Sequence, residues 1–198
     1  MDIKQSILDS INVLRAMVEK NEEHIRCAAE IMVDAVLQSH KILWCGNGGS
    51  AADAQHMAAE LMGGLRNHDR DPIPSIALTT DSSFITAWAN DTDYNSIFSR
   101  QLEALGESGD VLIAISTSGN SKNVLNAIHI AKERDMKVVV LTGLNGGTMA
   151  EMGSCSIVVP SEDTQRIQEG HLVVEHLLCE IVEEKFNVKN SDFRNTSG

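Results

Sequence analysis

Residues 111–141, VLIAISTSGNSKNVLNAIHIAKERDMKVVVL, decide the fold. The apolar run Val111–Ile115 is too short for a helix, and the polar residues after it lead into a helical pattern over Ser121–Arg134. A second short apolar run follows at Val138–Leu141. Two strands joined by a helix are typical of a parallel βαβ unit and therefore of a layered α/β architecture.

The same alternation extends over most of the chain. Three more short apolar runs lie at Ile42–Cys45, Ser75–Leu78 and Ile157–Val159. The remaining helical patterns of this region cover 51–65, 82–105 with a break near Asn90, and 163–184. Five near-continuous apolar strands predict a three-layer α/β sandwich, in which a central five-stranded parallel sheet is covered on both faces.

The residues outside this core are helical or polar. Apolar residues recur at spacings of three and four over 1–40, and Asn21 and Glu23 interrupt the pattern, which predicts extra N-terminal helices. These helices and the long last one exceed what one sheet needs for cover, so they favour an oligomer interface. The predicted organisation is a single domain over 1–198, with N-terminal helices (1–40), an α/β core (41–186) and a flexible tail (187–198).

Composition limits the possible classes of function. The chain has 198 residues, with 16 Lys+Arg against 28 Asp+Glu and a formal net charge of −12, which argues against a broad basic surface for nucleic acid. A loop of backbone N–H groups can still bind one phosphate in an acidic protein. No apolar run approaches the ~20 residues that span a bilayer, and no secretory signal is visible. Four scattered cysteines favour free thiols in a reducing compartment, so we expect a cytoplasmic protein that binds neither nucleic acid nor membranes.

Three glycine-containing loops follow three of the predicted strands, at the sheet edge where ligands bind in α/β proteins. The first, Cys45–Ser50, permits close backbone approach and offers Ser50 as a helix cap. The second, Ser116–Ser121, combines four hydroxyl groups with a helix start and predicts a phosphate cradle. The third, Gly143–Gly147, is interpreted as an ordinary turn. The chain has neither GxGxxG nor GxxxxGK[ST], which argues against dinucleotide and nucleoside triphosphate sites.

Two predicted helices carry candidates for chemistry. His56 and Glu60, spaced i,i+4, share a helix face, which suits two ligands of one metal or a carboxylate base beside an imidazole. Such a pair is also an ordinary surface contact. On the last predicted helix, Gln168 and His176 lie ~12 Å apart along the axis. One metal is therefore hard to reach from both, unless long side chains lean together or two subunits contribute.

Three segments carry a resemblance that covers nearly the whole chain, from about residue 20 to 186. They are ILWCGNGGSAADAQHMAAELMGG, ALTTDSSFITAWANDTDYNSIFSRQLEALGESGDVLIAISTSGNS and DTQRIQEGHLVVEHLLCEIVEE. The chain resembles the phosphoheptose isomerases of the sugar-isomerase (SIS) superfamily. STSGNS alone marks only a sugar-phosphate SIS domain, whereas QHMAAEL and RIQE…H are more specific. The resemblance implies the SIS, flavodoxin-like form of the predicted sandwich.

The resemblance implies an aldose–ketose isomerase. The family interconverts sedoheptulose 7-phosphate and D-glycero-D-manno-heptose 7-phosphate, the first step towards the ADP- or GDP-heptose precursors of the lipopolysaccharide core. A proton moves between C1 and C2 through an enediol(ate), which requires a base and an acid but no redox cofactor. The resemblance also implies one zinc ion per subunit and a homotetramer with sites at subunit interfaces.

Site residues follow from the resemblance by position. The phosphate would be bound by Ser116, Thr117, Ser118 and Ser121. The sugar would be contacted by Asn47, Gly48, Gly49, Ser50, Glu60, Asn90, Asp91 and Gln168. The zinc ligands would be His56, Glu60, Gln168 and His176. Glu60 would also be the base and His176 the acid, and we expect different subunits to supply these two residues.

Two positions depart from the family pattern. Gly64 stands where several relatives have an arginine, so Arg66 would have to replace that arginine from a shifted position. Gln165 stands where some relatives have an aspartate, and Asp163 lies two residues earlier. Zinc coordination would lower the basicity of Glu60, so either the metal binds loosely or the carboxylate exchanges between the two roles.

Two alternatives share the fold. One is a non-catalytic SIS-domain regulator that binds the replication initiator DnaA. That paralogue lacks an acid at the position of Glu60 and a histidine at that of His176, and has arginine at that of Ser118. The other alternative is an isomerase of another sugar phosphate, because the walls of the pocket set the substrate length.

Overall fold

The structure is a computed structural model that describes residues 2–196, and side chains as far as residue 188. Five parallel strands form one sheet in the order β2-β1-β3-β4-β5. The strands are β1 (Ile42–Cys45), β2 (Ser75–Ala77), β3 (Val111–Ser116), β4 (Lys137–Gly143) and β5 (Cys155–Val159). The predicted five-stranded parallel sheet is therefore confirmed.

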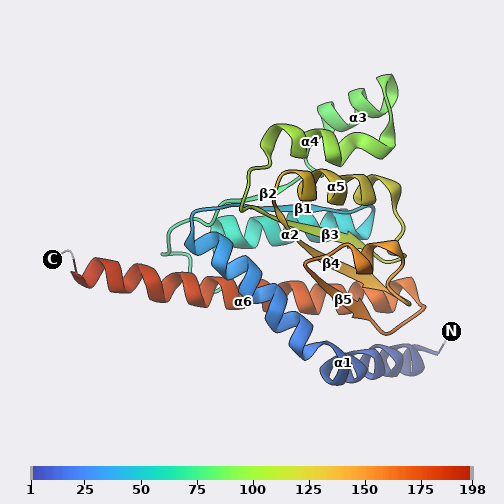
Figure 1. The fold of residues 1–198 in the computed structure, drawn as a ribbon. Helices are drawn as coiled ribbons and strands as arrows, with labels where there is room; N and C mark the ends of the chain where they lie inside the picture. The colour runs from blue at the N-terminus through green and yellow to red at the C-terminus, as the bar shows by residue number, and fades with distance from the viewer. Residues whose placement is uncertain (1, 197–198) are drawn as a thin grey trace.

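Helices cover both faces of this sheet (Figure 1). On one face lie α1 (Ile3–Leu37), α2 (Gly49–Gly63) and α6 (Thr164–Thr196). On the other lie α3 (Ser82–Asp91), α4 (Ile97–Leu105) and α5 (Lys122–Glu133). Two short 3-10 helices, η1 (Tyr94–Ser96) and η2 (Thr148–Glu151), follow α3 and β4. The three predicted layers are present, and within residues 2–196 no helix is long and apolar enough to cross a membrane.

Alternating side chains of the strands fill the two halves of the core. In β1, Ile42 and Trp44 face α1, α2 and α6, whereas Leu43 and Cys45 face the α4 and α5 layer. Because successive side chains of a strand point to opposite faces, a strand covered on both sides must be apolar throughout. This explains the continuous apolar runs of the sequence.

The N-terminal region differs from the prediction of more than one helix. α1 is one helix of 35 residues, which changes direction in its first half (Figure 1). Asn21, the expected interruption, is buried, and its Nδ2 donates to the backbone oxygen of Val158 at 3.2 Å. A tertiary contact with β5 therefore gives the Asn21 amide N–H a partner without breaking the helix, while its buried Oδ1 has no hydrogen-bond partner among the described residues.

The C-terminal region also differs from the prediction. α6 continues to Thr196, over most of the segment 187–198 that we expected to be a flexible tail. The segment 187–196 has no glycine or proline to end a helix that the core has already nucleated. Residues 197–198 of the predicted tail lie outside the described part of the chain.

The strand order places the loops of interest together. β1 pairs with both β2 and β3, so the chain leaves β1 towards one side of the sheet and later continues on the other. In sheets of this order, ligands bind at the carboxyl ends of the strands where the direction changes. The loops after β1 and β3 are the first and second glycine-containing loops of the sequence.

Candidate functional site

The second loop, Ser116–Ser121, gathers its hydroxyl groups at the carboxyl end of β3. Ser116 Oγ lies 2.9 Å from Ser121 Oγ and 3.4 Å from Ser118 Oγ. Ser118 Oγ also accepts the backbone N–H of Asn120 at 3.2 Å. Hydroxyl groups collected beside the start of α5 form an arrangement that can bind an anion, because free N–H groups and the helix dipole favour negative charge there.

The third loop supports the second one. Gly119 adopts φ +65, and a Cβ at this position would collide with the carbonyl group of Gly146. The Asn120 side chain spans the same gap, since its Oδ1 accepts the backbone N–H of Thr148 at 3.0 Å and the Thr148 hydroxyl at 2.9 Å. The third loop is a turn, as predicted, and it holds the hydroxyl-bearing loop in place.

The first loop begins α2 differently from the prediction. Gly48, with φ +59, is the residue that caps the helix, and Ser50 is a buried residue of the first turn. The expected cap at Ser50 is therefore wrong, because glycine adopts the positive φ that the chain requires two residues earlier. The same turn lies against α6, where the Gln168 side chain packs on Gly49.

Asn47 of the first loop is held by two neighbours. Its Oδ1 accepts Asn123 Nδ2 at 2.8 Å and the Tyr94 hydroxyl at 3.0 Å, and its Nδ2 donates to Asn123 Oδ1 at 2.9 Å. Sequence reasoning missed Asn123 and Tyr94, which belong to α5 and η1. The predicted residues Asn90 and Asp91 are exposed at the end of α3, where Asn90 Nδ2 donates to Asp91 Oδ1 at 2.7 Å.

A histidine–carboxylate cluster lies where α2 meets α6. His56 Nε2 is 3.1 Å from Glu60 Oε1, and the His56 ring lies edge-on to the His176 ring with centroids 5.0 Å apart. One chain therefore brings Glu60 and His176 to one place, and the expectation that different subunits supply them is wrong. The reason is that α2 and α6 run side by side, a relation that helix spacing in the sequence does not reveal.

Hydrogen bonding fixes the orientation of His176. Its Nδ1 lies 2.9 Å from the backbone oxygen of Leu172, one turn earlier in α6. A carbonyl oxygen only accepts, so Nδ1 carries a proton and Nε2 is the nitrogen left to exchange a proton or bind a ligand.

Two further carboxyl groups of the site were not predicted. Burial raises the pKa of Asp53, and the nearby imidazoles of His56 and His176 partly oppose that rise. Burial raises the pKa of Glu175 to about 8, and the neighbouring Asp53 contributes in the same direction. Glu175 is fully buried, and its two carboxyl oxygens have no hydrogen-bond partner among the described residues. A carboxyl group with a pKa of about 8 is mostly protonated at pH 7, so Glu175 adds little negative charge to the site.

The fit to a metal is incomplete in one chain. His56, Glu60 and His176 offer nitrogen and oxygen donors of the kinds that zinc prefers. Gln168 lies at Gly49 instead, and Gly49 and His56 are about 10 Å apart along α2. Within residues 2–196, no group of three or more His, Cys, Asp or Glu side chains is arranged to hold a metal ion.

Arg66 and Asp163, the residues that lie near the two departures from the family pattern, have structural roles. Arg66 forms an ion pair with Glu180 of α6, where its Nε donates to Glu180 Oε1 at 3.0 Å, so its guanidinium is engaged one turn beyond His176. Asp163 directly precedes α6, and its Oδ1 accepts the backbone N–H of Gln165, in the first turn of this helix, at 2.9 Å. Asp163 thus stabilises the start of this helix.

The family model and relatives of 37–52% identity point to one family. Residues 7–143 match the family model described as SIS domain. A phosphoheptose isomerase from Shewanella sp. (strain ANA-3) is 52% identical over 184 residues, which cover 91% of this chain and 93% of that protein. The structure of a phosphoheptose isomerase from Neisseria gonorrhoeae is similar with a TM-score of 0.87 and 43% identity, over 92% of this chain and 97% of the other. One from Francisella tularensis has a TM-score of 0.88 and 37% identity, over 92% and 96%.

Proposed function

The chain belongs to the SIS-domain family of phosphoheptose isomerases, and from this we propose that it interconverts sedoheptulose 7-phosphate and D-glycero-D-manno-heptose 7-phosphate. The observation that carries the proposal is the cluster of Glu60, His56 and His176 in a chain that also has the hydroxyl loop after β3. The first supplies a base and an acid, and the second supplies a binding site for phosphate.

The phosphate group is assigned to Ser116, Thr117, Ser118 and Ser121. Their hydroxyl groups and the start of α5 bind an anion without a basic side chain, which suits a chain with a net charge of −12. The sugar is assigned to the first loop, around Asn47, and to Asn90 and Asp91 at the end of α3. Binding at these points holds the substrate so that its C1 and C2 meet the acid and base.

Proton transfer is assigned to Glu60 and His176. The Glu60 carboxylate removes the proton from the carbon next to the carbonyl group and returns it to the neighbouring carbon, which interconverts ketose and aldose through the enediol(ate). His176, with Nδ1 bonded to Leu172, presents Nε2 to donate a proton to the carbonyl oxygen and then to take up the proton that the neighbouring hydroxyl group loses when the new carbonyl group forms. His56 contacts both residues and keeps the Glu60 carboxylate in place.

Zinc is part of the proposal. His56, Glu60 and His176 would hold it, and Gln168 is the fourth proposed ligand, although its side chain packs on Gly49. When bound, zinc would polarise the carbonyl group and stabilise negative charge on the enediolate.

We expect the purified protein to contain about one zinc ion per chain. His56→Ala should lose most of it, because an imidazole donor disappears, whereas His129→Ala, on the exposed face of α5, should retain it. Gln168→Ala should lower the zinc content less than His56→Ala does. Metal content by mass spectrometry after dialysis measures this directly, and equal zinc in wild type and His56→Ala would contradict the assignment.

The test of the activity is an NMR time course with sedoheptulose 7-phosphate in D₂O. We expect an aldoheptose 7-phosphate that carries deuterium at C2, because a carboxylate base exchanges its proton with solvent. Parallel samples with a ketohexose phosphate and a ketopentose phosphate should react more slowly. Faster conversion of either would favour an isomerase of another sugar phosphate. No conversion of any sugar by the zinc-loaded protein would contradict isomerase activity and favour the regulator that binds DnaA.

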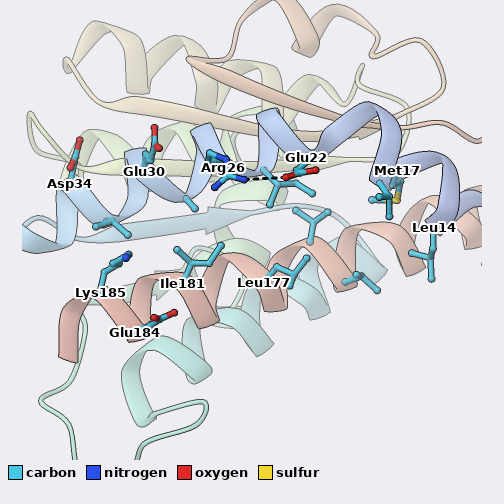
Figure 2. Close-up of a pocket in the computed structure, with 16 residues that line it drawn as sticks. Leu14, Met17, Glu22, Arg26, Glu30, Asp34, Leu177, Ile181, Glu184 and Lys185 are labelled. Atoms are coloured by element: carbon cyan, nitrogen blue, oxygen red, sulfur yellow. Dashed lines mark hydrogen bonds and ion pairs between the residues drawn. The ribbon is translucent and has the colours of Figure 1, made fainter. Parts of the chain in front are cut away.

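Assembly into a homotetramer is also part of the proposal. α1 and α6 form a groove of about 800 Å³ whose lining is mainly apolar (Figure 2). Leu177 and Ile181 of α6 project into it, opposite α1, and charged side chains such as Glu22 and Arg26 border it on the α1 side (Figure 2). Val18 is 69% exposed at this groove. A large apolar surface between two helices fits the same surface of a second copy.

Leu177→Glu is expected to break this assembly, because it places a charge in an apolar interface. Light scattering after size-exclusion chromatography should give four times the chain mass of 21.5 kDa for wild type and less for the variant. Leu105→Glu on α4 is the matched control, since both leucines are 40% exposed. Equal masses for wild type and Leu177→Glu would contradict an interface at this groove.

The cellular place of the reaction is proposed as the cytoplasm. Cys27, Cys45, Cys155 and Cys179, all within the described residues, are free thiols, and three of them are buried. Free buried thiols suit a reducing compartment. The product would enter the synthesis of nucleotide-activated heptose for the lipopolysaccharide core, as the name of the family implies.

A further inference from the structure

Tyr94 reaches the sugar-binding loop from a different part of the chain. It belongs to η1, is 52% exposed, and its hydroxyl donates to Asn47 Oδ1 at 3.0 Å. The resemblance assigned a sugar contact to Asn47 and to the neighbouring residues Asn90 and Asp91, but none to Tyr94. This hydrogen bond links η1 directly to the first loop.

The bonds around Asn47 determine what its side chain can offer to a ligand. Oδ1 accepts two hydrogen bonds, from Tyr94 and from Asn123 Nδ2, and these occupy both of its lone pairs. Nδ2 donates one N–H to Asn123 Oδ1. The second N–H of Nδ2 is the remaining polar group, so Asn47 is presented as a hydrogen-bond donor in one fixed orientation.

Asn123 and the backbone of η1 are held by hydrogen bonds that do not involve the Tyr94 hydroxyl. Asn123 Oδ1 also accepts the backbone N–H of Val124 at 3.0 Å, in the first turn of α5. Two hydrogen bonds hold η1 in place. Trp88 Nε1 donates to Ser96 Oγ at 2.9 Å, and Asn126 Nδ2 donates to the Asn95 carbonyl group at 3.0 Å. Removing the Tyr94 hydroxyl therefore leaves Asn47 with its two hydrogen bonds to Asn123 and does not release η1.

We propose that Tyr94 is a positioning residue for the sugar phosphate, which acts by fixing the Asn47 amide as a donor to a sugar oxygen. This inference rests on the proposed isomerase function. The hydroxyl occupies the second lone pair of Asn47 Oδ1. Without it, the amide has fewer constraints and must be ordered when the substrate binds, so binding weakens.

Tyr94→Phe tests the inference, because it removes the hydroxyl and keeps the ring. KM for sedoheptulose 7-phosphate should rise about threefold to tenfold, as expected for one hydrogen bond, with kcat and the melting temperature unchanged. Asn126→Ala is the matched control, since it removes another hydrogen bond of the η1 segment that does not reach Asn47. Its KM should stay within twofold of wild type.

A double-mutant cycle separates positioning through Asn47 from a purely structural role. In the Asn47→Ala background, Tyr94→Phe should change neither KM nor the dissociation constant measured by calorimetry. An equal rise in both backgrounds, or the same rise with Asn126→Ala, would overturn the inference. Wild type that fails to isomerise the sugar would instead contradict the proposed function. In that case, the cycle is read from calorimetric binding of sedoheptulose 7-phosphate, and absence of coupling, or of binding, overturns the inference.

Discussion

Replacing Glu60 by glutamine should lower kcat for sedoheptulose 7-phosphate by about 10²- to 10⁴-fold, the range typical of a lost general base. The amide keeps the size of the side chain and can still bond to His56, which lies 3.1 Å from Glu60 Oε1 in the wild type. It cannot accept the proton that moves between C1 and C2. NMR in D₂O measures the loss of turnover and the accompanying loss of deuterium incorporation at C2.

Glu180→Gln is the matched control for this substitution. Glu180 lies on α6 one turn beyond His176 and pairs with Arg66 near the surface, so its loss should change kcat by less than about twofold. Zinc content must be measured in both variants, because Glu60 is also a proposed ligand. A Glu60→Gln enzyme that keeps its zinc and more than a tenth of the wild-type kcat would show that another residue is the base.

Replacing Glu183 by alanine should lower the free energy of unfolding by about 3–5 kcal/mol, because it leaves a buried arginine without its partner. Arg70 Nε donates to Glu183 Oε2 at 2.9 Å, and the side chains are 2% and 3% exposed. The Glu183 carboxylate also accepts the backbone N–H groups of Leu65, Arg66 and Asn67 at 2.8–2.9 Å. Urea unfolding monitored by circular dichroism measures the loss.

The same carboxylate predicts a dependence of stability on pH. Burial alone would raise the pKa of Glu183, but hydrogen bonds from Arg70 and from three backbone N–H groups together lower it. Because the folded pKa is depressed, the stabilisation is present above the unfolded pKa of about 4.3 and is lost as pH falls through the folded value. Wild type should therefore lose more stability than Glu183→Gln below pH 4.

Glu180→Ala on the same helix is the control, since the exposed pair with Arg66 should contribute only about 0–1 kcal/mol. If Glu183→Ala does not fold, Glu183→Gln gives the same comparison with a smaller loss of unfolding free energy, because an amide oxygen still accepts N–H groups. Equal stabilities of the Glu183 and Glu180 variants would contradict the importance of the buried pair.

Much of the fold could be predicted because the signals were local. Runs such as Val111–Ile115 are too short for helices and too apolar for loops, so they indicated buried strands. Where a tertiary contact decided the outcome, the prediction was wrong. Asn21 was expected to interrupt a helix, but its Nδ2 donates to the distant Val158 and the helix continues. At the start of α2 the reason was local, since Gly48, with its positive φ, took the capping position expected for Ser50.

The structure shows where the predicted site residues lie, and their roles remain predictions. The hydroxyl loop could be identified because its residues are consecutive, and the structure places those hydroxyls together. The proximity of His56 and His176 depends on how α2 lies along α6, which no periodicity encodes. Tyr94 and Asn123 were missed because their contacts with Asn47 join residues 47 and 76 positions apart. Their roles, like those of Asn90, Asp91 and Gln168, remain predictions.

Consecutive residues of α6 belong to two different surfaces of this helix. His176 faces α2 and the proposed chemistry, and Val173 and Leu177 face the groove against α1. Evolution cannot vary these surfaces independently, because a shift of the helix that improves packing at the groove also moves the imidazole. If the groove is the proposed subunit interface, substitutions there should also change turnover, because they move the helix that carries His176.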